Sequence, residues 1–155
     1  MSDSKYNFQY CQKLVVFSKD AKQILLAKRH GEADYDGTFS FIGGKMETSD
    51  ESIIKGLQRE KNEEVGPSVR LNVYPLATHN VLFKKKDGSS MILPHYLAFY
   101  ADGEIKLNKA EYSQYQWVLV EDISAFEPKV ENITEMVNWA LALSKTIQQK
   151  DLVEI

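Results

Sequence analysis

Three glutamates near the end of one predicted helix constrain this chain more than any other feature. Residues 49–65 are predicted to be helical, and Glu60, Glu63 and Glu64 stand at positions i, i+3 and i+4, so their carboxylates share one face. Like charges at this spacing repel by about 0.2–0.5 kcal/mol, and the negative end of the helix dipole disfavours them further. A divalent cation such as Mg²⁺ or Mn²⁺ would relieve both penalties, because it prefers oxygen ligands. The alternative is a solvated polar face.

The sequence marks both ends of this helix and the loop before it. Thr48 and Glu51 have the spacing of a capping box, and Gly66-Pro67 is a typical stop signal. The pair Gly43-Gly44 allows a close approach of the backbone, which suits a loop that meets metal and phosphate. We therefore expect a glycine-containing loop that leads into the helix.

Residues 44–66 resemble the Nudix box, whose pattern is G-x5-E-x7-R-E-U-x-E-E-x-G-U with U an aliphatic residue. Arg59-Glu60, Glu63-Glu64 and Gly66 fall in register with it, and Glu51 lies the required eight positions before the arginine. A match of this length, in the loop and helix context that it requires, is a specific signal.

The chain departs from the pattern at three places. Gly44 lies seven residues before Glu51 instead of six, which predicts one extra residue in the loop. Asp50 has the six-residue spacing from the glycine, but its distance to the arginine does not fit the pattern. Lys61 and Pro67 stand at two aliphatic positions, and we expect Lys61 to bury its stem while its ammonium group reaches water.

The resemblance implies a catalytic role for a set of glutamates. In the family, the glutamates of the box bind Mg²⁺ or Mn²⁺, which here implies Glu60, Glu63 and Glu64, together with Gly44. Glu111 lies six residues before Trp117, which is similar to a late segment of MutT-type members whose glutamate reaches the metal site. Either Glu63 or Glu111 would be the general base, and the sequence leaves this choice open.

The resemblance also implies binding and structural roles. Glu51 and Arg59 would brace the loop against the helix, and a basic residue at the end of the second strand, Lys28 or Arg29, would approach substrate phosphates. Gly44 and the adjacent Lys45 are further candidate phosphate contacts, with a solvated lysine as the alternative for Lys45. The run Lys84-Lys85-Lys86 is more typical of a solubilising hairpin tip than of a binding site. His79 and His95 lack ligand-type neighbours, so each is expected to pack or to contact a base rather than to bind metal.

The remaining elements predict an α/β protein. Residues 11–17 and 23–28 are predicted to form a hairpin, and a longer hairpin is predicted to run from residue 69 to residue 100 with Asp87-Gly88 at its tip. A second helix is predicted at about residues 130–150. The resemblance implies that these elements form an α/β/α sandwich with a mixed sheet.

Length and composition restrict the class of protein. The 155 residues predict a single domain, residues 1–155, with a hydrophobic content of 43%. A net charge of −3 argues against binding of a nucleic-acid polymer, which favours basic patches. No segment has the pattern of a secretory signal or a membrane span, and the one cysteine, Cys11, is predicted to be a buried thiol of a reducing compartment. We therefore expect a cytoplasmic protein without a membrane partner.

The predicted function is Mg²⁺-dependent hydrolysis of a nucleoside diphosphate linked to another moiety. The spacing of Glu111 and Trp117 favours a MutT-like enzyme that cleaves a nucleoside triphosphate to a monophosphate and pyrophosphate. The alternatives are hydrolysis of ADP-ribose, sugar nucleotides or dinucleoside polyphosphates, and a catalytically silent nucleotide-binding Nudix module. A homodimer is common in the family and stays open here.

Overall fold

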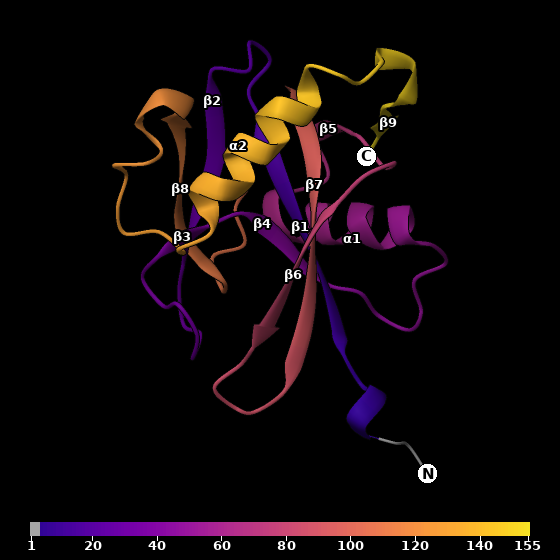
Figure 1. Ribbon diagram of the computed structural model, residues 1–155, viewed down its shortest axis with the longest axis vertical. Coiled ribbons are helices and arrows are strands. Elements are labelled where there is room, and N and C mark those ends of the chain that lie inside the picture. The colour runs from indigo at the N-terminus through magenta and orange to yellow at the C-terminus, as the bar shows by residue number, and fades with distance from the viewer. Residues whose placement is uncertain (1–3) are drawn as a thin grey trace.

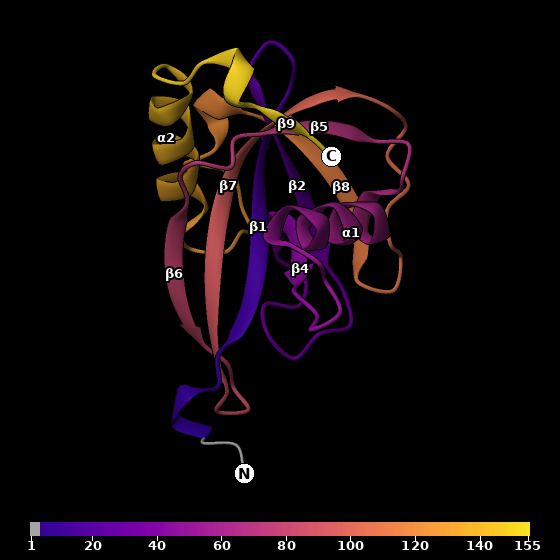
Figure 2. The same ribbon diagram turned by 90° about the vertical axis from the view of Figure 1, so that its right-hand side faces the viewer.

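The computed structural model describes residues 4–155, and residues 1–3 of the expected domain lie outside the described part. A mixed β-sheet lies between two helices, α1 (Ile53–Val65) and α2 (Ile133–Ser144), which cover its opposite faces (Figure 2). The α/β/α sandwich implied by the resemblance is therefore confirmed.

The sheet contains nine strands and is mixed, because β1 and β7 run parallel while the other pairs are antiparallel (Figure 1). The main path has the order β3-β2-β1-β7-β5-β9, while β4 pairs with β1, β6 with β7 and β8 with β2. The strands are β1 (Gln9–Phe17), β2 (Gln23–Arg29), β3 (Phe39–Ser40), β4 (Ile42–Lys45), β5 (Arg70–Val73), β6 (His79–Lys84), β7 (Ser90–Asp102), β8 (Tyr112–Leu119) and β9 (Val153–Glu154). Three 3₁₀ turns complete the chain, at Ser4–Tyr6, Val120–Asp122 and Gln149–Asp151.

The two faces of the sheet form two separate cores, and strand β1 contributes to both. Leu14 and Val16 pack with the α1 side, while Val15 and Phe17 pack with the α2 side. Side chains alternate between the faces of a strand, so a strand buried on both faces must be apolar throughout. This explains the continuous hydrophobic run at the end of β1.

Both predicted hairpins are present. Strands β1 and β2 pair in antiparallel fashion, and β6 pairs with β7 from His79↔His95 to Lys84↔Ser90, with Asp87-Gly88 in the turn. Helix α2 is shorter than the predicted span of residues 130–150, because the chain leaves the helix at Lys145 and ends in a 3₁₀ turn and β9. None of the helices in the described part of the chain has the length and apolarity needed to span a membrane.

The predicted end of helix α1 is correct, but the predicted start is wrong. Gly66 ends the helix with a φ of 96°, a conformation that glycine adopts readily. The helix begins at Ile53 rather than at residue 49, and Ser52 caps it by accepting a hydrogen bond from the Lys55 N–H at 3.1 Å. Residues 47–50 instead form a turn in which the Glu47 N–H donates to Asp50 Oδ2 at 2.8 Å. The capping box of Thr48 and Glu51 therefore does not form.

Lys61 does not reach water, contrary to the expectation from the sequence. Its side chain is buried, with 2% of its surface exposed, and Nζ donates a hydrogen bond to the Val69 carbonyl at 2.5 Å. Burial lowers the pKa of this lysine, while the charge of Glu154 acts in the opposite direction. The lysine thus replaces an aliphatic residue inside the core and ties α1 to the segment before β5.

We predict that Lys61 makes the stability of the protein depend on pH in the alkaline range. The folded pKa lies below the ordinary value of 10.5, so between the two values the unfolded chain binds more protons and stability rises with pH. The variant Lys61→Met should therefore gain stability relative to the wild type near pH 7, and the difference should shrink towards about pH 10. Urea unfolding at both pH values measures it.

The exposed Lys55 on the same helix supplies the control. Lys55→Met removes the same charge without changing the core, so its stability difference should not vary in this way. Equal pH dependence of the two variants would contradict the prediction.

Candidate functional site

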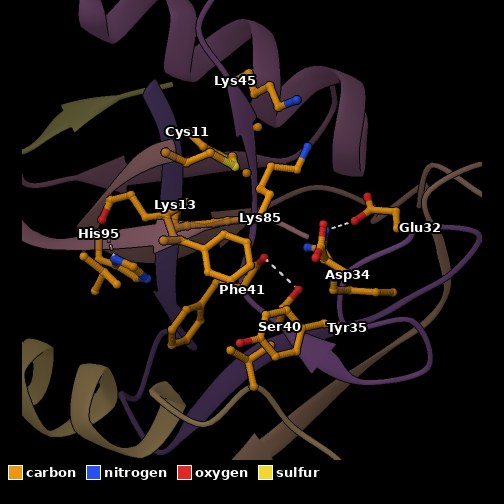
Figure 3. Close-up of a pocket in the computed structure, with 18 of the residues that line it drawn as sticks. Cys11, Lys13, Glu32, Asp34, Tyr35, Ser40, Phe41, Lys45, Lys85 and His95 are labelled. Atoms are coloured by element: carbon orange, nitrogen blue, oxygen red, sulfur yellow. Dashed lines mark hydrogen bonds and ion pairs between the residues drawn. The ribbon is translucent and has the colours of Figure 1, made fainter. Parts of the chain in front are cut away.

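One cavity of about 900 Å³ opens between strand β4, the loop before β3, the β6–β7 hairpin and the start of α2. This volume is within the range typical of small-molecule sites. Charged and aromatic side chains line the cavity: the carboxylates of Glu32, Asp34, Glu47, Glu60, Glu63, Glu111 and Glu131, the cationic groups of Lys13, Arg29, Lys45 and Lys85, and the rings of Tyr35, Phe41, Phe83, His95 and Tyr112. Figure 3 shows several of them, among them Lys13, Asp34 and His95.

Strand β4 places a glycine directly against a carboxylate of helix α1. The register pairs Gly43 with Lys13 and Gly44 with Gln12, so the glycine pair is held at the edge of β1. A Cβ atom on Gly44 would lie 1.8 Å from Glu60 Oε2. Only glycine at this position allows the Glu60 carboxylate to lie against the backbone.

Four glutamates act on one another here: Glu60, Glu63 and Glu111 line the cavity, whereas Glu64 is buried and does not line it. Burial raises the pKa of Glu60, and the neighbouring carboxylates Glu63 and Glu111 act in the same direction, while Arg59 opposes them. Burial also raises the pKa of Glu64 to about 9, with a further contribution from Glu111. The structure thus brings Glu111, which is distant in sequence, to the glutamates of the Nudix box.

Tyr112 lies beside this cluster and was not identified from the sequence. Its side chain is buried, and burial together with the Glu64 carboxylate raises its pKa well above the usual value. A tyrosine hydroxyl that stays protonated can donate a hydrogen bond to Glu64. Its position follows from strand β8, which pairs with β2 so that Tyr112 lies opposite Arg29.

Arg59 pairs with Asp50, and the prediction that Glu51 would be its partner is wrong. Arg59 Nε donates to Asp50 Oδ1 at 2.8 Å and Nη2 donates to Oδ2 at 2.9 Å, which is a two-pronged pair. The hydrogen bonds of Arg59 lower the pKa of Asp50 to about 2. Glu51 is exposed and makes no ion pair with Arg59 among the described residues.

The physical reason lies in the path of the loop. Asp50 is six residues after Gly44, so the loop has the length of the family pattern up to this carboxylate. The extra residue is therefore located between Asp50 and the helix, not before Glu51. Gly56 makes room for this arrangement, because a Cβ atom there would lie 2.8 Å from Asp50 Oδ2.

Arg59 also holds two of the expected metal ligands. Its Nη1 donates to Glu60 Oε1 at 2.8 Å and to both oxygens of Glu63 at 3.2 Å, and Nη2 donates to the Lys45 carbonyl at 3.1 Å. Within residues 4–155, no three His, Cys, Asp or Glu side chains stand so that they could hold a metal ion together. Metal binding would require Glu60 or Glu63 to turn away from the guanidinium group.

The chemistry of the carboxylate cluster nevertheless fits a hard divalent cation. Glu64 Oε2 is buried without a hydrogen-bond partner among the described residues. Its neighbour Glu111 is a carboxylate as well, and the charge of Lys13 and the hydrogen bond with Tyr112 offset the burial of Glu64 only in part, because its pKa stays raised. Mg²⁺ or Mn²⁺ binds such oxygen-rich sets.

The cationic side chains lie along the same cavity. Arg29 is partly buried, pairs with Glu32, and has its Nε buried without a partner among residues 4–155. Figure 3 shows Lys45 and Lys85 on one side of the cavity and Ser40 and Phe41 on another. The predicted phosphate contacts Arg29 and Lys45 are thus both at the cavity, as is Gly44.

Lys85 is a site residue that the sequence interpretation missed. Alternation along β6 turns Val81 and Phe83 towards the cavity and leaves Lys84 exposed, and Lys85 continues the inward series. Hydrogen bonds from Ser89, together with the charges of Lys85 and Lys45, lower the pKa of Asp87. Lys85 therefore lies at the cavity, where counting in steps of two from Val81 would have placed it, and a role in binding stays a prediction.

Aromatic rings line the same cavity. Tyr35 and Phe83 pack with their ring centres 5.6 Å apart, and Phe41 meets His95 edge to face at 5.7 Å. The Tyr35 hydroxyl donates to Glu131 at 2.9 Å, which ties the loop before β3 to the segment before α2. Flat apolar walls of this kind suit a nucleobase.

Comparison with known families agrees with this geometry. The family model for the NUDIX domain matches residues 13–140, which is most of the chain. The chain belongs to the Nudix family.

The names of similar Nudix proteins indicate different substrates or ligands. A CTP pyrophosphohydrolase of Escherichia coli (strain K12) is 41% identical over 64 residues, a match that covers 41% of this chain and less than half, 45%, of that protein. A MutT protein from Methanosarcina mazei Go1 has a similar structure, with a TM-score of 0.71 and 22% identity over 90% of this chain and 96% of that one. The NUDIX domain of Shewanella oneidensis NrtR, complexed with ADP ribose, has a TM-score of 0.71 and 18% identity, covering 92% and 94%. At these identities the two structures show a shared fold.

We predict that Asp50, and not Glu51, supports the site through Arg59. Asp50→Asn should reduce kcat/KM by roughly 10- to 100-fold, as is typical when a residue that orients a ligand is lost. It should also remove a stabilising contribution that is present above about pH 4 and is lost as the pH falls towards 2, because the folded pKa is lowered. Steady-state kinetics and acid unfolding measure the two effects.

Glu51→Gln changes the adjacent carboxylate in the same way and serves as the control. Its kinetics and acid unfolding should match the wild type. A larger loss of activity in Glu51→Gln than in Asp50→Asn would show that the brace is assigned to the wrong residue.

Proposed function

We propose that this Nudix protein is a Mg²⁺-dependent pyrophosphohydrolase that cleaves a nucleoside triphosphate to a nucleoside monophosphate and pyrophosphate. The observation that supports it best is one cavity lined by four cationic side chains, by carboxylates that include Glu60, Glu63 and Glu111, and by aromatic rings. A nucleotide matches this lining, because its anionic phosphates suit cationic side chains and metal ligands, and the flat apolar faces of its base suit aromatic rings.

The proposed ligands of the cation are Glu60, Glu63 and Glu64, with Gly44 beside them. A bound divalent cation would offset the charge of the phosphates and lower the pKa of a water molecule. Either Glu63 or Glu111 would take the proton of that water, and both line the cavity. Glu111 lies beside the buried Glu64, whereas Glu63 is half exposed at the rim, so the two candidates differ in environment.

The chain itself would bind and orient the phosphates. Arg29, Lys45 and Lys85 approach the cavity from three different elements, β2, β4 and the β6–β7 hairpin. Positive groups placed around a phosphate chain stabilise charge that develops in the transition state. Arg59 would act indirectly, because it holds the loop that carries the Lys45 carbonyl.

The name of the sequence relative supports a triphosphate substrate, whereas the names of structural neighbours support other nucleotide substrates. The sequence relative is a CTP pyrophosphohydrolase, whereas structural neighbours include a domain complexed with ADP ribose and an Ap4A hydrolase of C. elegans. Hydrolysis of ADP-ribose, sugar nucleotides or dinucleoside polyphosphates is therefore the second candidate, and a silent nucleotide-binding module is the third. A single domain over residues 1–155, a homodimer and a cytoplasmic location stay predictions.

We predict that one substrate class yields a nucleoside monophosphate when the protein is incubated with Mg²⁺. The panel contains nucleoside triphosphates, oxidised triphosphates, ADP-ribose, sugar nucleotides and dinucleoside polyphosphates, and chromatography identifies the products. Glu63→Gln should lower kcat at least about 100-fold, because it loses a ligand or the base, and a chelator should abolish turnover. If nothing is hydrolysed with Mg²⁺ or Mn²⁺ while a nucleotide still raises the melting temperature, the protein is a binding module.

We further predict that Lys85 contacts the phosphates. Lys85→Met should raise KM for the preferred triphosphate about tenfold, since a hydrogen bond to a charged group is worth about 1.5–3 kcal/mol. Lys84→Met removes the same charge from an exposed position of the same hairpin and should leave KM unchanged. Equal KM values for the two variants would mean that Lys85 does not reach the substrate.

A further inference from the structure

His95 is a buried histidine on the sheet side of the cavity, and its proton can be assigned. Its side chain is 2% exposed, and it lines the cavity from strand β7. Nδ1 lies 2.9 Å from the Leu93 carbonyl and 3.2 Å from the His79 carbonyl. Carbonyl oxygens only accept hydrogen bonds, so Nδ1 must carry the proton and donate.

The other ring nitrogen, Nε2, is therefore a hydrogen-bond acceptor. It has no hydrogen-bond partner within residues 4–155. Burial lowers the pKa of His95 to about 4, with the charge of Lys13 acting in the same direction, so the ring is neutral at physiological pH. Nε2 is not among the fully buried polar atoms that lack a partner, so it is accessible at the cavity that His95 lines. A donor on a bound ligand can therefore reach this acceptor.

The sheet register fixes the place of His95 relative to the carboxylate end of the cavity. Gly43 pairs with Lys13 on β1, and Lys13 pairs with His95 on β7, so the three residues form a row across the sheet. Two strand spacings correspond to about 10 Å. A nucleotide whose phosphates lie at the β4 end would therefore extend its ribose and base along the row towards His95.

The atom of a base that points away from the glycosidic bond would then meet Nε2. In cytosine and adenine this position carries an amino group, which donates, whereas in uracil and guanine it carries a carbonyl oxygen, which accepts. A carbonyl oxygen facing Nε2 would bring two acceptors together without a donor between them. The edge-to-face contact with Phe41 limits rotation of the imidazole ring.

We propose that His95 Nε2 reads the base, accepting a hydrogen bond from the exocyclic amino group, so that the site prefers cytosine and adenine nucleotides to uracil and guanine nucleotides. This inference rests on the proposed function, since it assumes that the cavity binds a nucleotide with its phosphates at the glutamates. His95 is thus a specificity-determining residue and takes no part in bond cleavage.

The kinetic test compares substrates that differ at this one position of the base. The ratio of kcat/KM for CTP over UTP, and for ATP over ITP, should be about ten or more in the wild type. His95→Phe should bring both ratios close to one. His95→Gln, which can present an amide oxygen in place of Nε2, should keep part of the preference, which a purely structural role of His95 would not explain.

His79→Phe is the matched control. His79 lies next to His95 in the same row on β6, but its ring packs on Trp139 with centres 5.6 Å apart and does not line the cavity. Its CTP to UTP ratio should equal that of the wild type. Loss of the ratio in His79→Phe, with retention in His95→Phe, would overturn the assignment.

Binding of CMP and UMP, measured by calorimetry without turnover, separates this inference from the proposed function. Tighter binding of CMP that is lost in His95→Phe supports the inference even if no triphosphate is hydrolysed. Equal affinities for CMP and UMP in the wild type, together with equal kcat/KM for CTP and UTP, overturn it even if hydrolysis is fast. If His95→Phe does not fold, the comparison of CMP with UMP and of CTP with UTP in the wild type still tests the inference.

Discussion

The contacts of the Arg59 guanidinium group hold the site together. The group pairs in two-pronged fashion with Asp50 in the loop, reaches Glu60 and Glu63 on its own helix, and donates to the Lys45 carbonyl. An arginine stays charged at every physiological pH and its donors have a fixed geometry, so it can offset several carboxylates at once. The loop after β4 and the last turns of α1 therefore form one rigid unit.

Several buried titratable side chains surround this unit, and burial shifts each towards its neutral form. Glu64 and Tyr112 have raised pKa values, whereas Lys61 and His95 have lowered ones. These side chains differ in their hydrogen-bond partners. Lys61 donates to a backbone carbonyl, whereas one oxygen of Glu64 has no partner among the described residues. A free carboxylate oxygen at the carboxylate cluster suits a cation, whereas the lysine contributes to packing.

The division of the cavity follows from the sheet. Strands β4, β1 and β7 place Gly43, Lys13 and His95 in one row, while the β6–β7 hairpin brings Lys85 and Phe83 over it. The sheet therefore sets the separation between Gly43 and His95. The same glutamates could serve different Nudix substrates, and the residues along this row would decide which base fits.

The sequence by itself determined the end of helix α1, because its stop signal is local, and the sandwich fold, because the family pattern implies it. It could not determine that Asp50 replaces Glu51 as the partner of Arg59, since one extra residue can be placed on either side of that carboxylate and only the path of the loop decides. The tertiary structure likewise decided that Lys61 is buried and that Lys85 faces the cavity, because the direction of a long side chain depends on what packs around it.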